Sequence, residues 1–509
     1  MRNYIKYLGI LALTFTACEP EFDTPVDESG TYSSGELDLS HYVAVGNSLT
    51  AGFADNALYI TGQENSFPNI MAEKFQHVGG GDFSQPLMAD NAGGLLLDGQ
   101  QIADTRLVLN IGEDGTQAPV NYRGAQPTTE ITNTLQGPFN NMGVPGAKSF
   151  HFLAAGYGSV EGVSTGTANP YFARFASDPS ASVIADAASQ DPTFFTLWAG
   201  NNDVLGFATS GGVGEDQTGN FDLSSYGSND ITDPNVFAMV YTQLVDALVA
   251  NDADGVLINI PPVTAVPYFN TVPVNAIPLD EATAGILNEQ FQAYNELILP
   301  GLAGVGILSP EEVAARQISF SAGQNYVTLV DEDLTDISGI VQGPPFNLDQ
   351  QTANLIGQLR QATDQDLIPL PTSSFLGTLV NEDPTMINGV SVPLGDQHVL
   401  TSSEQEMVRT ATEAYNATIQ ALAEQHDLGH FDSSAFLSQL AEDGISYDGG
   451  LLTADFGTGG VFSLDGIHLT PRGNALVADR IIQVLNQKYG ANLPRVDIGN
   501  YPTITPHND

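Results

Sequence analysis

Basic residues, cysteine and long hydrophobic runs are all scarce in this chain. Of its 509 residues only 14 are Lys or Arg, against 60 Asp or Glu, so the formal net charge is -46. A surface this acidic repels nucleic-acid phosphates and anionic lipid headgroups, so we predict no nucleic-acid partner and no direct adsorption to a membrane. Because few carboxylates have a basic partner, we also expect weaker folding at low ionic strength.

The only cysteine, Cys18, excludes an internal disulfide. It ends an N-terminal segment with a basic start and an apolar stretch over 7–17, which is too short to remain as a spanning helix. The segment resembles a bacterial lipoprotein signal, in which the cysteine becomes the lipidated first residue. The acidic residues 19–23 either resemble the surface-export signal of Bacteroidetes lipoproteins or form an ordinary acidic tether. The resemblance implies lipid anchoring at Cys18 to the outer membrane of the cell envelope; the alternative is a plain secreted protein with a free thiol.

We divide the chain into four parts by composition. Residues after the cysteine are rich in Pro, Glu, Asp, Ser and Gly, which is typical of a flexible linker. Two later stretches carry Gly and Pro breaks with only short apolar runs, and we interpret them as large insertions. The ranges are a signal peptide over 1–17, an acidic tether over 18–40, one domain over 41–490 with insertions at about 79–138 and 204–398, and a C-terminal tail over 491–509.

Strand and helix patterns alternate along the predicted domain. Apolar runs rich in β-branched and aromatic residues predict buried strands, and apolar spacing of three and four predicts amphipathic helices. The predicted strands are 42–45, 193–199 and 255–260, and the predicted helices are 67–75, 147–155, 236–249, 282–299, 401–426 and the segment that opens at 470. This alternation favours an α/β fold with a parallel central sheet and helices on both faces.

A candidate nucleophile, Ser48, follows the first predicted strand. The Gly-Asn-Ser sequence over 46–48 indicates a sharp turn at the carboxyl end of a parallel strand, where α/β enzymes present reacting groups. Near the other end of the chain, Asp465 stands three residues before His468, a spacing that lets the carboxylate hold the imidazole in one tautomer. An Asp and a His before a helix also serve simply to cap it, and a serine at such a turn can do the same.

Four short motifs together resemble the SGNH (GDSL-type) hydrolases. They lie at residues 46–49, 141–146, 200–203 and 465–468, in the order found in that family. The resemblance implies a three-layer α/β/α sandwich for the core and makes Ser48 the nucleophile, His468 the base and Asp465 its orienting acid. It further implies an oxyanion hole formed by the backbone N–H groups of Ser48 and Gly143 and by the side-chain amide of Asn202.

One departure from the family pattern is Asn47, which stands where an Asp usually precedes the serine. We predict a lipid-anchored serine esterase that hydrolyses lipid or short-chain carboxylic esters through an acyl-enzyme at Ser48. The alternatives are a carbohydrate O-acetyl esterase and a surface-anchored binding lipoprotein without turnover. No cofactor is expected, and no metal site: the acidic stretch over 251–255 lacks ligands of a calcium loop, and the remaining histidines have no ligand spacing. Trp198 is interpreted as a core residue, with contact to substrate as the alternative.

Overall fold

The computed structural model describes residues 31–112, 115, 117–383 and 385–504. Its centre is a sheet of five parallel strands in the order β13-β8-β7-β1-β6. Their bounds are β1 (Tyr42–Gly46), β6 (Asn141–Gly143), β7 (Phe194–Trp198), β8 (Asp254–Ile258) and β13 (Gly429–Phe431). In chain order this is the doubly wound arrangement 2-1-3-4-5, whose strand order reverses between β1 and β7, the place where such sheets bind ligands.

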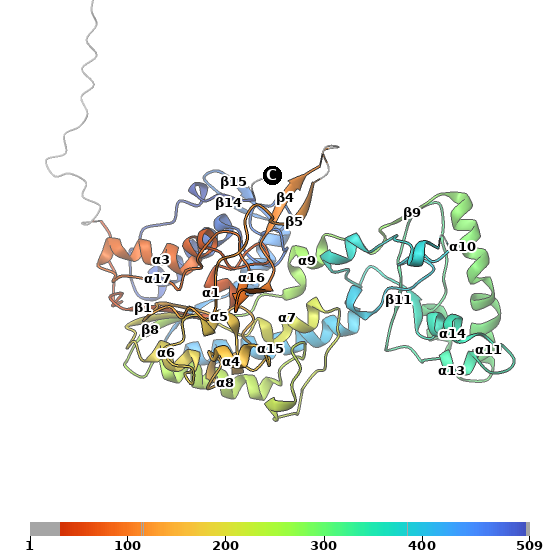
Figure 1. The fold of residues 1–509 in the computed structure, drawn as a ribbon, viewed down its shortest axis with the longest axis horizontal. Coiled ribbons are helices and arrows are strands. Elements are labelled where there is room, and N and C mark those ends of the chain that lie inside the picture. The colour runs from red at the N-terminus through yellow and green to blue at the C-terminus, as the bar shows by residue number, and fades with distance from the viewer. Residues whose placement is uncertain (1–30, 113–114, 116, 384, 505–509) are drawn as a thin grey trace, which may run out of the picture.

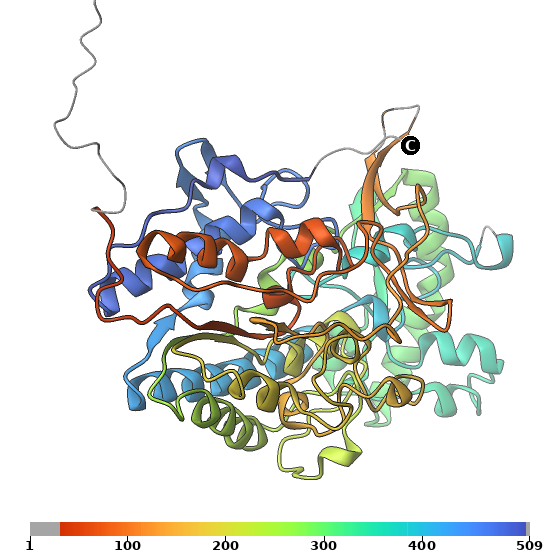
Figure 2. The same ribbon diagram turned by 60° about the vertical axis from the view of Figure 1, so that its left-hand side comes forward.

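Helices cover both faces of the sheet, so the structure confirms the α/β class with a parallel sheet and fits an α/β sandwich (Figures 1 and 2). On one face lie α3 (Phe67–Phe75) and α17 (Pro471–Lys488), which pack against each other. On the other lie α6 (Val183–Ala188), α8 (Pro234–Leu248) and α15 (Ser402–Gln425).

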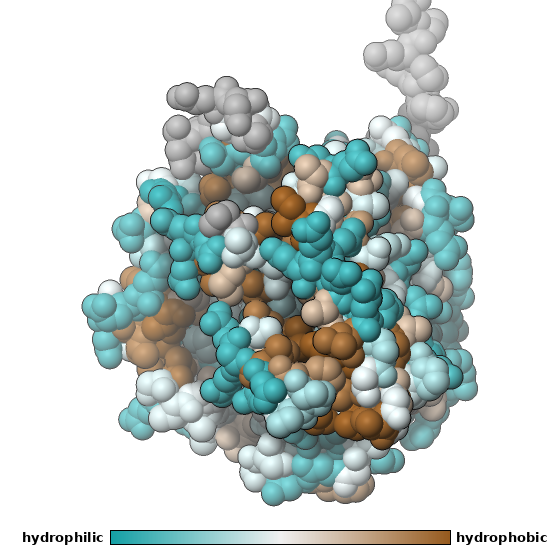
Figure 3. All heavy atoms as spheres, turned by 90° about the vertical axis from the view of Figure 1, so that its right-hand side faces the viewer, coloured by the Kyte–Doolittle hydropathy of each residue, from teal (hydrophilic) through white to brown (hydrophobic). Residues whose placement is uncertain are grey.

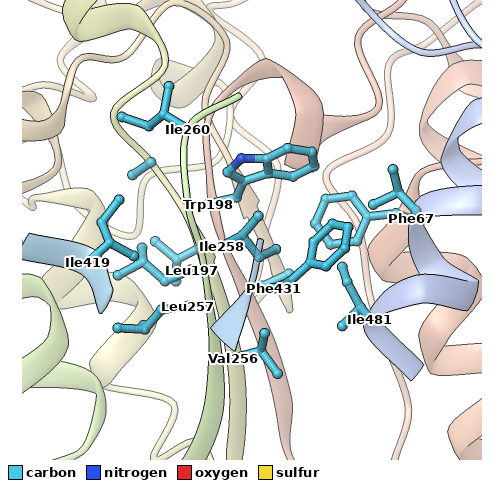
Figure 4. Packing of buried hydrophobic residues seen from close by; sticks show 14 of the residues in the cluster. Phe67, Leu197, Trp198, Val256, Leu257, Ile258, Ile260, Ile419, Phe431 and Ile481 are labelled. Atoms are coloured by element: carbon cyan, nitrogen blue, oxygen red, sulfur yellow. The ribbon is translucent and has the colours of Figure 1, made fainter. Parts of the chain in front are cut away.

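The strands are buried on both faces because they are almost continuous apolar runs. Every residue of β1 and β7 is buried. Alternate side chains leave opposite faces: Leu197 points toward Ile419 of α15, while Trp198 points toward Phe67 of α3 (Figure 4). The indole N–H of Trp198 donates to the Asn259 carbonyl, so this residue belongs to the core.

The long helices begin where the sequence places their caps. The Asp233 side chain accepts two backbone N–H groups at the start of α8, and Thr470 caps α17. Thr401 and Glu404 form a capping box at the start of α15, which satisfies otherwise unpaired N–H groups of the first turn. The structure confirms the predicted helices at 67–75, 236–249 and 401–426.

Several elements differ from the prediction. The segment predicted as a helix over 147–155 forms only a 3-10 turn, η3 (Ser149–Leu153). A helix that the sequence analysis did not predict, α16 (Ser433–Glu442), follows β13 and is capped by Asp432. The shorter elements of this part of the chain are α1 (Ser48–Ala51), α2 (Ile60–Glu64), η2 (Gln76–Val78), α4 (Val160–Val163), α5 (Pro170–Ala173), α7 (Asn202–Thr209), η4 (Leu223–Ser225), η5 (Val263–Ala265), α9 (Pro267–Asn270), β14 (Ile445–Tyr447), β15 (Gly450–Leu452) and η10 (Ile498–Asn500).

Residues 272–399 form a second lobe with a hydrophobic cluster of its own, on the right of Figure 1. The predicted insertion over 204–398 is therefore too wide, because α8 and β8 lie within that range and belong to the central core. Figure 3 shows apolar side chains on the outer face of this end of the molecule, and exposed examples are Ile286, Leu297 and Val305. The lobe contains β9 (Ile277–Leu279), α10 (Glu281–Ala293), the π-helical η6 (Tyr294–Ile298), α11 (Leu299–Gly304), α12 (Pro310–Ala315), β10 (Gly323–Asn325), β11 (Thr328–Val330), α13 (Ser338–Val341), α14 (Gln350–Ile356), β12 (Leu359–Gln361), η7 (Leu370–Ser374), η8 (Val380–Glu382) and η9 (Asp396–His398).

Residues 79–138 form loops and two hairpins. The hairpins pair β2 (Leu95–Leu97) with β3 (Gln100–Ala103) and β4 (Leu107–Ile111) with β5 (Gln117–Asn121). No helix in the described part of the chain is both long and apolar enough to cross a membrane.

Both predicted ends of the domain need correction. The signal peptide and Cys18 lie outside the described residues, but the predicted tether over 18–40 extends too far, because Leu37 and Leu39 are buried in the main core. Ser33 pairs with Asn492, and the predicted tail is anchored by buried side chains such as Leu493. The packed chain thus reaches beyond 41–490 on both sides.

Candidate active site

Ser48 lies at the switch point of the sheet, on the turn between β1 and α1. Asn47 accepts the Leu49 N–H through its side chain (3.3 Å) and donates to the Asn201 side chain (3.2 Å), which ties the turn to the end of β7. Gly46 is required here because a Cβ would come within 2.2 Å of the Thr50 hydroxyl. The turn is therefore fixed on both sides of a serine that is only 8% exposed.

The structure brings His468 and Asp465 to this serine from 420 residues away along the chain. His468 Nε2 lies 2.8 Å from Ser48 Oγ, and His468 Nδ1 lies 2.9 Å from Asp465 Oδ2. Asp465 Oδ1 also accepts the backbone N–H groups of Ile467 (2.9 Å) and His468 (2.8 Å), so the loop before α17 folds around its own carboxylate.

Asp465 is ionised, and this fixes the roles of the imidazole nitrogens. Burial raises the pKa of Asp465, but the His468 charge and the hydrogen bonds from His468 and Ile467 outweigh it and hold the pKa well below its usual range. A carboxylate can only accept, so Nδ1 of His468 donates to it. In the neutral ring Nε2 is then the acceptor, and it faces the Ser48 hydroxyl.

Two residues that the sequence analysis missed, Asp55 and Asn56, clamp the Asp465 loop. Asp55 Oδ1 accepts the Leu464 N–H (3.0 Å), and the Asn56 N–H donates to Asp465 Oδ2 (2.9 Å). Both have positive φ angles, 52° and 60°, which Asp and Asn tolerate better than most residues. The sequence signal for this turn was the adjacent Asp and Asn, which are residue types that tolerate a positive φ angle. Their partners, Leu464 and Asp465, lie more than 400 positions further along the chain.

Asp55 also links the site to the segment that follows. Its Oδ2 accepts the Tyr59 hydroxyl (2.7 Å), its backbone carbonyl accepts the Leu107 N–H (2.7 Å), and the Arg106 guanidinium stacks over the Tyr59 ring. Burial raises the pKa of Asp55 even though Leu464 and Tyr59 donate to it, and the nearby Asp465 charge raises it further.

The predicted oxyanion donors differ in their availability. The Gly143 N–H donates to the Asn141 side chain (3.0 Å), and a Cβ at Gly143 would meet the Ala51 nitrogen at 2.3 Å. Gly143 therefore permits close packing of α1 on β6, and its assignment to the oxyanion hole is corrected because its N–H is already paired. Asn202 opens α7 and donates from Nδ2 to the Ala147 carbonyl (2.9 Å); since an amide has two N–H groups, one remains.

A second glycine on the same turn, Gly146, has a backbone N–H group that, unlike that of Gly143, donates to no described residue. Gly146 follows β6, is exposed, has a φ of 78° and has no atom within 4 Å of where a Cβ would stand. No hydrogen bond from its N–H to another described residue is present. Val144 donates to the Gly46 carbonyl, so this turn adjoins the end of β1, where Ser48 follows.

One cluster of three carboxylates offers oxygen ligands of the kind that hard cations bind. Glu332, Asp396 and Glu404 each place an oxygen within 4.8 Å of the others. Burial and mutual repulsion raise the pKa values of Asp396 and Glu404 to about 7. The cluster lies where the start of α15 meets the second lobe, and none of its residues lines the pocket at Ser48.

The described residues therefore form a doubly wound α/β protein with a Ser–His–Asp array at its switch point. No family model, curated protein or solved structure gives a significant match to the chain.

Proposed function

We propose that the protein is a serine esterase of SGNH type. Its core is a three-layer α/β/α sandwich, and residues 79–138 and 272–399 are additions to that core. The observation that carries the proposal is the hydrogen-bonded series Ser48 Oγ, His468 Nε2, His468 Nδ1 and Asp465 Oδ2, with separations of 2.8 and 2.9 Å. A nucleophile, a base and an ionised group that orients the base are the parts that acyl transfer needs.

The mechanism follows from these roles. Ser48 Oγ attacks the ester carbonyl carbon while its proton passes to His468 Nε2, and the resulting imidazolium is stabilised by Asp465. The imidazolium then protonates the leaving alcohol as the C–O bond breaks, which leaves an acyl group on Ser48. Water, activated by the same nitrogen, hydrolyses that acyl-enzyme and returns Ser48.

The developing oxyanion needs donors at the carboxyl edge of β1, β6 and β7. The Ser48 N–H stands at the first position of α1, where backbone N–H groups have no partner within the helix. We assign the other donors to the Gly146 N–H and to the second N–H of the Asn202 side chain. Loss of one such donor typically lowers kcat about 100- to 1000-fold.

Hydrolysis of p-nitrophenyl butyrate tests the proposal. Wild-type protein releases p-nitrophenol and Ser48→Ala does not. Ser228→Ala serves as the control because that serine is exposed and its hydroxyl hydrogen-bonds to the neighbouring Asn229 side chain. If wild type and Ser48→Ala hydrolyse the ester at equal rates, Ser48 does not catalyse the reaction. That result would favour the alternative of a binding lipoprotein without turnover.

We further propose that Cys18 carries a lipid that anchors the protein in the bacterial cell envelope. The sequence pattern around Cys18 supports this proposal. Incorporation of labelled palmitate, with Cys18→Ser as the control, tests it; label retained by Cys18→Ser would contradict it.

A further inference from the structure

The pocket that adjoins Ser48 and His468 is small and mainly apolar. Its volume is about 40 Å³. Its polar lining consists of the site residues Ser48 and His468 with Asn47 and Asn201. The apolar lining residues are Leu49, Leu205, Pro261, Val263, Val266 and Ile467.

The volume limits the group that can enter. A water-sized group occupies roughly 10–15 Å³ of such a cavity, so the pocket accepts roughly three or four non-hydrogen atoms. With the carbonyl carbon at Ser48, this corresponds to an acyl group of about two to four carbons in total. A fatty-acyl chain of eight or more carbons would extend beyond the pocket.

The walls are held in place from both sides. The Tyr268 N–H donates to the Gly466 carbonyl (3.0 Å), which joins the segment carrying Val263 and Val266 to the loop of His468. The Tyr268 hydroxyl donates to the Thr209 carbonyl (3.3 Å) at the end of α7, the helix that carries Leu205. Because both walls share these contacts, one cannot move away without the other.

The lining also excludes charged acyl groups. It contains no Lys or Arg, so a terminal carboxylate or phosphate on the acyl chain would be desolvated without a partner. The net charge of the chain, -46, adds a general repulsion of anions.

We propose that this pocket holds the acyl part of the substrate and selects uncharged acyl groups of two to four carbons, with the alcohol part outside it. The inference rests on the proposed esterase function and specifies its substrate class. Short-chain esters, including acetyl esters of larger alcohols, fit the pocket, and long-chain lipid esters do not.

Val263 offers a direct way to change the selectivity. It lines this pocket and also a second, open pocket of about 460 Å³ beside α15, so the two pockets meet at this residue. Val263→Ala shortens the side chain at this meeting point, and we expect it to extend the acyl pocket toward the larger one. Val204→Ala is the matched control, because Val204 is fully buried beside Leu205 on α7 and does not line the pocket.

The experiment measures kcat/KM for p-nitrophenyl acetate, butyrate and octanoate with the three proteins. We expect wild type to prefer acetate or butyrate over octanoate by about 10-fold or more, since single methylene groups change discrimination by about 10-fold and upward. Val263→Ala raises the octanoate-to-butyrate ratio by about 10-fold, and Val204→Ala leaves that ratio unchanged.

Each other outcome overturns the inference. If wild type prefers octanoate while hydrolysis still requires Ser48, the acyl-pocket inference fails and the esterase proposal stands. The same holds if Val263→Ala leaves the octanoate-to-butyrate ratio unchanged. If no ester is hydrolysed by folded wild-type protein, both the inference and the proposed function fail.

Discussion

At the scale of single residues, the site depends on groups that hold the catalytic loop as well as on the groups that react. Asp465 is fixed by two N–H groups of its own loop and by the N–H of Asn56. The Asp55 carboxylate fixes the preceding residue, Leu464, by accepting its N–H. The position of the His468 imidazole thus depends on contacts made by Asp55 and Asn56, which lie near the other end of the chain.

Asp55→Ala is expected to lower kcat about 10- to 100-fold with little change in KM, because it frees the Leu464 N–H and allows the Asp465 loop to shift. Asp55→Asn is the matched variant: it keeps an acceptor for Leu464 and tolerates the positive φ. Steady-state kinetics of both variants measure the effect. Equal losses in the two variants, or a loss confined to KM, would contradict a positioning role.

Asp465→Asn is expected to lower kcat by about 10,000-fold, because an amide can donate to His468 Nδ1 and so favours the tautomer whose Nε2 carries the proton. The Asp465 carboxyl stays ionised as pH falls through the ordinary carboxyl range, because its pKa is held well below that range. Pre-steady-state acylation rates in wild type and Asp465→Asn check this, and an acylation rate that Asp465→Asn leaves intact would contradict it.

At the scale of elements, the parts that the sequence predicted are those with local signals. The strand β1 is a short apolar run followed by Gly-Asn-Ser, and α8, α15 and α17 carry caps and apolar faces that can be recognised without tertiary contacts. The Ser48, Asp465 and His468 roles came from motifs of this kind, and the structure brings the three side chains together.

The parts that the sequence did not predict depend on distant contacts. Leu37 and Leu39 lie in a stretch with the composition of a tether, yet they pack into the core formed by segments far along the chain. The elements of the second lobe are mostly short, and its hydrophobic cluster joins residues spread over more than 100 positions. The Gly143 assignment fails for a different reason, because the Asn141 side chain two residues earlier accepts its N–H.

The contact of α15 with the second lobe makes the stability of the protein depend on pH. Asp396 and Glu404 have ordinary pKa values of 3.8 and 4.5 and folded values of about 7, raised by burial and by neighbouring carboxylates that include Glu332. Glu215, Asp216, Asp331 and Asp333 line the same cavity. Groups with raised folded pKa values stabilise the fold fully below pH 4, and this stability is lost as pH rises through 7.

Asp396→Asn is therefore expected to flatten the fall of Tm between pH 5 and pH 8 and to raise Tm at pH 8 by about 1–3 °C. Differential scanning calorimetry at both pH values provides the measurement, with Asp443→Asn as the control because Asp443 is exposed and lies outside the cluster. A variant whose Tm profile runs parallel to that of wild type would contradict the repulsion between these carboxyls.

At the scale of the whole molecule, the dominant feature is the charge of -46. The screening length falls from about 10 Å at 0.1 M salt to about 3 Å at 1 M, so repulsion among surface carboxylates weakens over that range. We expect Tm to rise by several degrees, or about 1 kcal/mol or more in stability, between dilute buffer and 1 M NaCl. Glycine betaine at the same osmolality is the uncharged control, and an equal rise in both solutes, or a flat Tm in NaCl, would contradict the account.

The most direct test of the central claim, that Ser48 is a nucleophile activated by His468, is covalent labelling with a fluorophosphonate followed by peptide mapping by mass spectrometry. We expect one stoichiometric adduct on the peptide that contains Ser48, and we expect its loss in His468→Ala protein that keeps the wild-type circular dichroism spectrum. Folded wild-type protein that acquires no adduct at Ser48, or His468→Ala protein that is labelled as fast as wild type, would contradict it.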